Sequence, residues 1–174
     1  MNLPIKSKRL YITELDESMA ESVHINSLDD DNRRFVPDEV FETVDEARET
    51  IATLVSFYSK QNVPLVYAIM LNNGRQIGHI QAVPIPQGWE IGYHIAKAFC
   101  GNGYATEAVK VFLPKIFQYL EISQMYGICH AKNVASRKVL EKCGFALKYE
   151  GLGQYHGREQ AICKYLFTIK NLQQ

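Results

Sequence analysis

The sequence GWEIGYHIAKAFCGNGYATEA, residues 88–108, holds the change of pattern that decides the fold. Its first part, Trp89–Ile95, is short and rich in aromatic and β-branched residues, so we expect a strand. From Tyr104 onward apolar residues recur every three or four positions, which is typical of a helix. The loop between them, Gly101-Asn102-Gly103, predicts an anion site, because glycines let a ligand approach the backbone and the first helical turn has free N–H groups. An ordinary loop with two glycines is the alternative.

Two familiar phosphate motifs do not fit this loop. A Walker loop requires Gly-x-x-x-x-Gly-Lys-Ser/Thr, and the chain has no Gly-Lys pair. The dinucleotide fingerprint requires Gly-x-Gly-x-x-Gly, but Thr106 stands at the third glycine, and the next expected strand ends in Cys129-His130 instead of an acid. The sequence therefore excludes both nucleotide sites.

The residues before the loop predict an antiparallel meander. Leu65–Leu71 and Gln76–Val83 have the composition of strands and are joined by Asn72-Asn73-Gly74-Arg75. Asn-Gly favours a hairpin turn, because both residues tolerate positive φ. Gln87-Gly88 makes the next turn, and Trp89–Ile95 is the third strand.

Nearer the N-terminus we expect one strand, Leu10–Thr13, and two helices. The first helix follows Asp16, where apolar residues recur with helical spacing. The second begins at Thr43-Val44-Asp45-Glu46, a capping-box pattern, and its apolar residues share one face. The segment Asp29–Val40 between them is rich in Asp and is expected to be a loop.

The residues after the glycine loop predict two more helices and three strands. Pro114 lies inside the first of these helices and should kink it or end its first half. Asn133 is an expected N-cap of the second helix, and Gly144 fits the left-handed position behind it. The expected strands are Met125–Cys129, Phe145–Tyr149 and Ile162–Ile169, and Gly151–Gln160 is expected to be a loop.

The resulting order is strand, two helices, three strands, helix, strand, helix and two strands. It predicts an α/β (α+β) fold with one central mixed, mostly antiparallel sheet of about six to seven strands and about four helices on its faces. No repeat or linker interrupts the pattern, so residues 1–174 are expected to form one domain with its core over about residues 8–169.

Composition and charge narrow the function classes. The 19 basic residues balance the 19 acidic ones, so no bulk charge favours a nucleic-acid partner, although local patches are compatible with a zero sum. The sequence has no signal-peptide pattern and no run near the roughly 18 apolar residues of a membrane span, so we expect a cytoplasmic protein without a membrane partner. The four cysteines lack Cys-x-x-Cys or zinc spacing, so we expect reduced, mostly buried thiols and no metal.

Two blocks of sequence together resemble a known family. Glu90-Ile91-Gly92-Tyr93 followed by Gly101–Ala108 resembles the coenzyme A (CoA) signature of the GNAT superfamily, and Asn133–Phe145 is similar to its Asn-x-x-Ser…Glu-Lys-x-Gly-Phe element. The expected order of elements matches the GNAT fold over nearly the whole chain, and the most similar branch is the ribosomal-protein N-terminal acetyltransferase-like (RimJ/RimL-like) one. The resemblance implies an N-acetyltransferase that moves an acetyl group directly from acetyl-CoA to a primary amine, on a small molecule or a protein N-terminus, and it is compatible with a homodimer.

The resemblance also implies roles for individual residues. The backbone at His94, Ile95 and Ala96 would pair with the pantetheine arm as an added strand does. The N–H groups of the glycine loop and the first helical turn would hold the pyrophosphate, and Asn133 and Ser136 would reach the cofactor from the next helix. These loop residues are Gly101, Asn102, Gly103, Tyr104, Ala105 and Thr106.

Three residues depart from the pattern of the family. Cys100 stands where the family usually has Arg or Gln, so a side-chain contact to phosphate is lost and weaker binding is expected. Pro114 interrupts the cofactor helix, but a full turn or more beyond its phosphate end. Ala161 stands near where this branch often has an acidic residue before the last strand, which weakens any inference from the acceptor preference of the branch to that of this chain.

Acetyl transfer needs a neutral amine and hence a base. At pH 7 the free-energy cost of deprotonating the amine is roughly 4.6 kcal/mol for a lysine amine with a pKa near 10.4, and about 1 kcal/mol for an α-amino group with a pKa near 7.8. Glu90 and His94 are candidate bases, because the period of two places them on one face of their strand. By resemblance, Ser136 or a nearby tyrosine would protonate the leaving thiolate. Each of these three residues also has a purely structural interpretation. Glu90 would be a solvated or paired strand carboxylate, His94 an ordinary structural histidine, and Ser136 a residue that caps or packs the first turn of its helix.

The sequence leaves other questions open. Cys100 and Ala161 are also compatible with a non-catalytic acyl-CoA-binding module that serves as a sensor or partner surface. A longer acyl donor, such as succinyl-CoA, would use the same loop. The acceptor amine and the choice of base among Glu90, His94 and water do not follow from the residues, although aspartates in Asp29–Val40 hint at a cationic acceptor.

Overall fold

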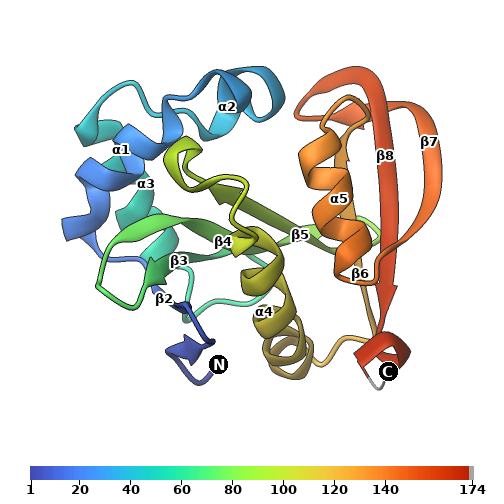
Figure 1. Cartoon of the computed structure of the whole chain (residues 1–174), viewed down its shortest axis with the longest axis horizontal. Coiled ribbons are helices and arrows are strands. Elements are labelled where there is room, and N and C mark those ends of the chain that lie inside the picture. The colour runs from blue at the N-terminus through green and yellow to red at the C-terminus, as the bar shows by residue number, and fades with distance from the viewer. Residues whose placement is uncertain (173–174) are drawn as a thin grey trace.

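The computed structural model describes residues 1–172, which form one eight-stranded sheet with helices around it (Figure 1). Across the sheet the order is β1-β2-β3-β4-β5-β6-β8-β7. All neighbours are antiparallel except β5 and β6, which are parallel. The strands are β1 Ile5–Lys6, β2 Leu10–Glu14, β3 Leu65–Leu71, β4 Gln76–Ile85, β5 Gly88–Ile95, β6 Gln124–His130, β7 Ala146–Tyr155 and β8 Arg158–Thr168.

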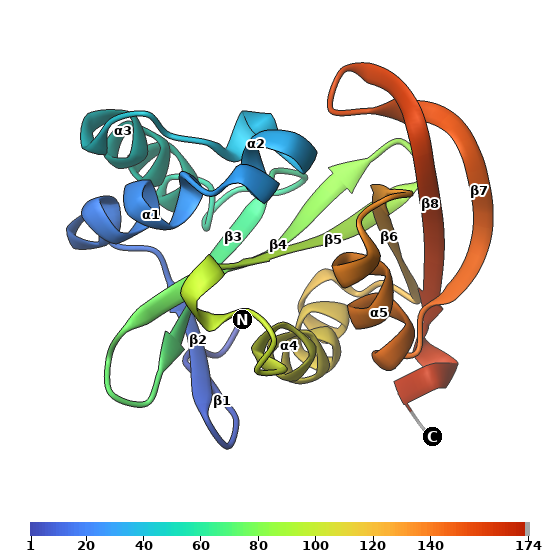
Figure 2. The same ribbon diagram turned by 45° about the horizontal axis from the view of Figure 1, so that its top comes forward.

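Helices cover both faces of this sheet (Figure 2). In β3, Leu65, Tyr67 and Ile69 pack in the cluster that contains α4, whereas the alternate residues pack against α1 and α3. This explains why β3 is an almost continuous apolar run, since a strand covered on both faces has no solvent side. The α-helices are α1 Ala20–Ser27, α2 Asp30–Phe35, α3 Val44–Val55, α4 Tyr104–Leu120 and α5 Val134–Lys142, and the short 3₁₀ turns are η1 Glu17–Met19, η2 Pro37–Glu39, η3 Lys97–Phe99 and η4 Ile169–Leu172.

The sheet divides between its two parallel strands. β5 and β6 pair at Glu90 and Tyr126, and from there β5 continues to Ile95 and β6 to His130 without pairing to each other. Figure 2 shows their carboxyl ends well apart. The edge of β5 beyond Glu90 therefore faces an opening, and α4 and α5 begin near that opening.

The expected mixed sheet is confirmed, but its strands and helices are more numerous than expected. The sheet has eight strands and not about six to seven, in part because β1 has two residues and is too short for a sequence pattern. The expectation of a loop over Asp29–Val40 is wrong, because Asp30–Phe35 form α2. The side chain of Asp29 caps this helix, and acids begin it while arginines end it, as the helix dipole favours.

Pro114 does not end its helix, since α4 continues from Tyr104 to Leu120. Proline leaves the carbonyl four residues earlier without its helical donor, and that residue, Lys110, is exposed to water. The residues around Pro114 are buried in the main core, so packing holds the helix together there. These are Phe112, Leu113, Ile116 and Phe117.

The expectation of a loop over Gly151–Gln160 is also wrong, because β7 and β8 extend to a tight turn at His156-Gly157. Both turn residues have positive φ, 49° and 69°, as a two-residue hairpin requires. Gly151 and Gly153 fit a strand here because a Cβ at either would come within 2.6 Å of a neighbouring side chain. Glycine thus marks close packing in this hairpin.

Several local predictions are confirmed. The capping box joins Thr43 and Glu46, and the hairpin turn lies between β3 and β4. The Asn133 side chain caps α5, and Gly144 has a φ of 86° behind that helix. The Phe145 N–H donates to the Leu140 carbonyl at 3.0 Å, which completes a Schellman motif.

Candidate active site

A cavity of about 1190 Å³ lies at the division of the sheet. Its walls come from β4, β5, β6, α5, the α2–η2 segment and the tip of the β7–β8 hairpin. Six of the predicted site residues line it: Glu90, His94, Ile95, Ala105, Asn133 and Ser136. Ala96, Gly101, Asn102, Gly103, Tyr104 and Thr106 are outside this lining and continue from it along the loop and α4.

The glycine loop has the backbone that its sequence predicts. Gly101 and Gly103 have φ of 80° and 79°, a conformation that side chains disfavour. Gly103 is the N-cap of α4 and contributes no side chain, so the N–H groups of the first turn are not capped by one. Residues 101–103 are exposed. This helix end is therefore open to an anionic group.

Glu90 is a half-buried carboxyl in the wall of the cavity. Its burial raises its pKa from 4.5 to about 8, although a hydrogen bond from Tyr155 opposes this change. The Tyr155 hydroxyl comes from the hairpin tip, lies 3.5 Å from Glu90 Oε1 and donates to the Ile128 carbonyl at 3.0 Å. The raised pKa favours the protonated form of Glu90 near neutral pH, and Glu90 becomes a base as the pH rises toward and above about 8.

His94 is held by an aspartate from another part of the chain. Its Nε2 lies 3.2 Å from Asp29 Oδ2, and both side chains are largely buried. Burial lowers the pKa of His94, the charge of His79 lowers it further, and Asp29 opposes both. A neutral His94 that donates from Nε2 to Asp29 keeps a free lone pair on Nδ1. His94 is thus in its basic form near neutral pH.

A second imidazole–carboxylate pair lies beside the first. His79 Nε2 is 3.2 Å from Glu39 Oε2, and Gln81 donates to Glu39 Oε1 at 2.8 Å. Burial raises the pKa of Glu39, but the contacts with His79 and Gln81 outweigh it and lower the pKa to about 2. The His79 and His94 rings are 5.7 Å apart. The sequence-based predictions missed Glu39, His79 and Gln81. The alternation of His79 and Gln81 on β4, and the acidic composition of the segment that carries Glu39, are the signals that could have indicated them.

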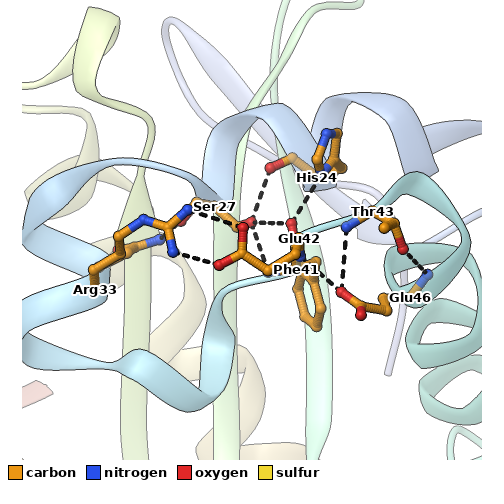
Figure 3. Close-up of polar contacts among 8 residues, drawn as sticks. His24, Ser27, Arg33, Phe41, Glu42, Thr43 and Glu46 are labelled. Carbon is orange, nitrogen blue, oxygen red and sulfur yellow. Dashed lines mark hydrogen bonds and ion pairs between the residues drawn. The ribbon is translucent and has the colours of Figure 1, made fainter.

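The segment that carries Asp29 and Glu39 is fixed at both ends (Figure 3). The Phe41 N–H donates to Ser27 Oγ at 3.0 Å, and His24 Nδ1 lies 2.8 Å from the Phe41 carbonyl. Arg33 pairs with Glu42, whose N–H donates to Glu46 at 2.7 Å. These contacts connect α1, α2 and α3, so the carboxylates are presented from a fixed wall. These polar contacts join His24, Ser27, Arg33, Phe41, Glu42, Thr43 and Glu46.

Ser136 and Tyr93 form a hydroxyl pair on the opposite wall. Their oxygens are 3.1 Å apart, and the Tyr93 hydroxyl also donates to the Ser136 carbonyl at 3.0 Å. Asn133 Oδ1 accepts from the Ser136 N–H at 3.0 Å, so Asn133 has the capping role that the sequence allowed. The Ser136 hydroxyl is not part of that cap.

The four thiols are unpaired, and only Cys100 is exposed. The Cys100 thiol donates to the Ile95 carbonyl at 3.2 Å. A thiol carries no positive charge, so Cys100 supplies none to the glycine loop. Residues 1–172 contain no group of three or more side chains arranged to hold a metal ion. No helix within the same residues is long and apolar enough to cross a membrane.

The sheet opens between two parallel strands, and a glycine-initiated helix begins at the opening, as the resemblance to the GNAT superfamily implies. The model of the acetyltransferase (GNAT) domain matches residues 9–146, and the chain belongs to this family. The sequence-based identification is confirmed, and the chain is an acetyltransferase with the mixed α/β GNAT fold.

Similar proteins agree with this assignment. The Probable N-acetyltransferase YjcK from Bacillus subtilis is 27% identical over 151 residues, which cover 81% of this chain and 82% of that protein. A GNAT-family acetyltransferase from Bacillus anthracis has a similar structure, with a TM-score of 0.81, 22% identity and coverage of 95% and 98% of the two chains. RimL, a ribosomal L7/L12 α-N-protein acetyltransferase solved with coenzyme A, gives a TM-score of 0.80, 20% identity and coverage of 97% and 99%. At these identities the structures show the fold alone.

Proposed function

We propose that the protein is an acetyl-CoA-dependent N-acetyltransferase that transfers acetyl directly to a primary amine in a ternary complex. The observation that carries this proposal is a cavity that contains Glu90 and His94 beside the unpaired edge of β5 and reaches the first turn of α4 at Ala105, next to the open N-terminus of that helix. The coenzyme A in the RimL structure supports the choice of cofactor.

The proposed cofactor site follows the open edge of β5 and the start of α4. Beyond Glu90, β5 has no strand partner on the side that β6 leaves. We propose that the pantetheine arm adds there as a strand along His94, Ile95 and Ala96, although the Ala96 N–H already donates to the Ile77 carbonyl at 2.8 Å. The N–H groups of Gly101, Asn102, Gly103, Tyr104, Ala105 and Thr106 would hold the pyrophosphate. Asn133 and Ser136 would face the same ligand from α5.

In the proposed reaction the amine nitrogen attacks the thioester carbon, the carbon–sulfur bond breaks, and the amine proton passes to a base. Near neutral pH His94 is the group in the basic form, and Glu90 joins it only above about pH 8. The leaving thiolate takes a proton from the Ser136–Tyr93 hydroxyl pair, and solvent returns a proton to that pair. Burial raises the pKa of Tyr93, which opposes this step, but a thiol pKa near 8.5 makes the thiolate a good leaving group that needs only modest help. Glu90, His94 and Ser136 are therefore the proposed catalytic residues.

The acceptor is proposed to be a small amine or a protein N-terminus. RimL is named for the second type, and this chain has its fold. Acidic side chains of the α2–η2 segment line the cavity and are compatible with a cationic amine. We further propose that residues 1–174 act as one domain in the cytoplasm, either alone or as a homodimer.

Two measurements test the proposal. Millimolar acetyl-CoA should raise the melting temperature, and a panel of amines and N-terminal peptides should include one that releases free thiol from acetyl-CoA. No thermal shift would contradict cofactor binding. A shift without turnover, with an active control enzyme in the same assay, would favour the non-catalytic acyl-CoA-binding module that Cys100 and Ala161 allow. Competition between acetyl-CoA and succinyl-CoA tests the length of the acyl group.

A further inference from the structure

The turn between β1 and β2 contacts the glycine loop from the other end of the chain. Arg9 Nε lies 2.6 Å from Glu107 Oε2, and Arg9 Nη1 donates to the Asn102 carbonyl at 2.9 Å. The Arg9 N–H and Ser7 Oγ both donate to Glu107 Oε1, at 3.0 and 2.8 Å. The guanidinium carbon also lies 4.5 Å from the centre of the Tyr104 ring. One arginine thus contacts the loop and the first turn of α4 together.

These contacts restrain a loop that otherwise has little to hold it. Gly101 and Gly103 flank Asn102, and no described atom lies within 4 Å of the place where a Cβ on Gly101 would stand. Within the loop, the Asn102 side chain bonds only to the nearby carbonyls of Phe99 and Cys100. Glycines have many accessible conformations, so ordering them at the moment of binding would reduce affinity. Arg9 provides the long-range restraint.

Arg9 also compensates an unfavourable charge. Glu107 lies in the first turn of α4, the end where an anionic ligand is expected. Burial raises the pKa of Glu107, but the hydrogen bonds from Ser7 and Arg9 outweigh it, so the net pKa is lowered and the group is ionised. An unpaired carboxylate there would repel a pyrophosphate. Cys100 brings no positive charge to the loop, which leaves Arg9 to balance Glu107.

We propose that Arg9 is a positioning residue for the cofactor: it holds the Asn102 carbonyl and neutralises Glu107, so that the loop N–H groups are arranged for the pyrophosphate before coenzyme A binds. This inference rests on the proposed function. The turn between β1 and β2 would thus contribute to cofactor affinity, although it lies outside both the glycine loop and the Asn133–Phe145 block.

The test is a double-mutant cycle with Arg9→Ala, Glu107→Gln and the double variant, in which the Kd of coenzyme A is measured by calorimetry. Arg9→Ala should raise Kd about tenfold in the wild-type background. It should raise Kd about threefold or less in the Glu107→Gln background, because the charge to be neutralised is then gone. In turnover, the KM for acetyl-CoA should rise while kcat stays within twofold. Arg48→Ala, which removes another exposed arginine paired with an acid, is the matched control.

The outcomes separate this inference from the proposed function. If wild-type protein does not bind coenzyme A, the proposed function fails. If wild type binds and Arg9→Ala changes Kd less than twofold, or changes it equally in both backgrounds, the role of Arg9 is refuted. Should Arg9→Ala fail to fold, Arg9→Lys replaces it, since an ammonium cannot make the forked contact with Glu107 and Asn102. An intermediate loss of affinity is then expected, and wild-type affinity would contradict the proposal.

Discussion

Replacement of Glu90 by glutamine should make the protein more stable at neutral pH. Burial raises the pKa of Glu90 from 4.5 to about 8, so between these values the folded chain holds a proton that the unfolded chain has released. The free energy of unfolding therefore falls by about 1.4 kcal/mol per pH unit across this window. From pH 4.5 to pH 7 the loss amounts to about 3 kcal/mol, and Glu90→Gln, which has no charge to bury, avoids it.

Urea unfolding of the wild type and Glu90→Gln at pH 5, 7 and 9 measures this difference. The gap should stay below about 1 kcal/mol at pH 5, reach about 3 kcal/mol at pH 7 and stop growing above pH 8. A gap that does not depend on pH would refute the burial argument. A loss of turnover in the more stable variant would mark Glu90 as a functional group retained at the expense of stability.

Glu39→Gln is the control of opposite sign. Its folded pKa of about 2 lies below the usual value of 4.5, so the ionised group stabilises the fold above pH 4.5 and loses that effect as the pH falls toward 2. At pH 7 the substitution should lower the free energy of unfolding by about 3 kcal/mol. Equal effects of the two substitutions would show that the side-chain amide, and not the charge, dominates.

Three further substitutions test other parts of the site and fold. Asp29→Asn keeps an N-cap for α2 but removes the carboxylate that raises the pKa of His94. The acidic limb of the pH–rate profile should therefore move to lower pH, and an unchanged profile would rule out His94 as the base. Ser136→Ala leaves the Asn133 cap intact, because that cap uses the Ser136 N–H. The substitution should lower kcat about tenfold with little change in the KM for acetyl-CoA, and an unaltered kcat would exclude the Ser136 hydroxyl as the acid. Gly144→Ala should destabilise the fold by about 1 kcal/mol in urea, because its φ of 86° strains any residue with a Cβ, and a neutral result would contradict the assigned role of this glycine.

The predictions that succeeded concern contacts between near neighbours. The capping box at Thr43, the Asn73-Gly74 turn and the Asn133 cap each depend on residues a few positions apart. The predictions that failed also have local reasons. α2 is too short for a hydrophobic period. Gly151 and Gly153 are typical of a loop, although in the strand they fit beneath Tyr149 and against Ile162. Of the two effects expected of Pro114, the end of the helix is contradicted, because α4 continues through Pro114 and the residues around it are buried in the main core.

What the sequence determined by itself is the order of the longer elements, the glycine loop and its family, because these depend on spacing along the chain. The tertiary structure alone decided how the groups of the site are charged. Asp29 reaches His94 across 65 positions, and Arg9 reaches Glu107 across 98. Burial of Glu90 depends on the hairpin tip and on the opening of the sheet, and neither has a signal at Glu90 itself. A pKa reflects desolvation and the neighbours in space, so it becomes defined only when distant segments meet.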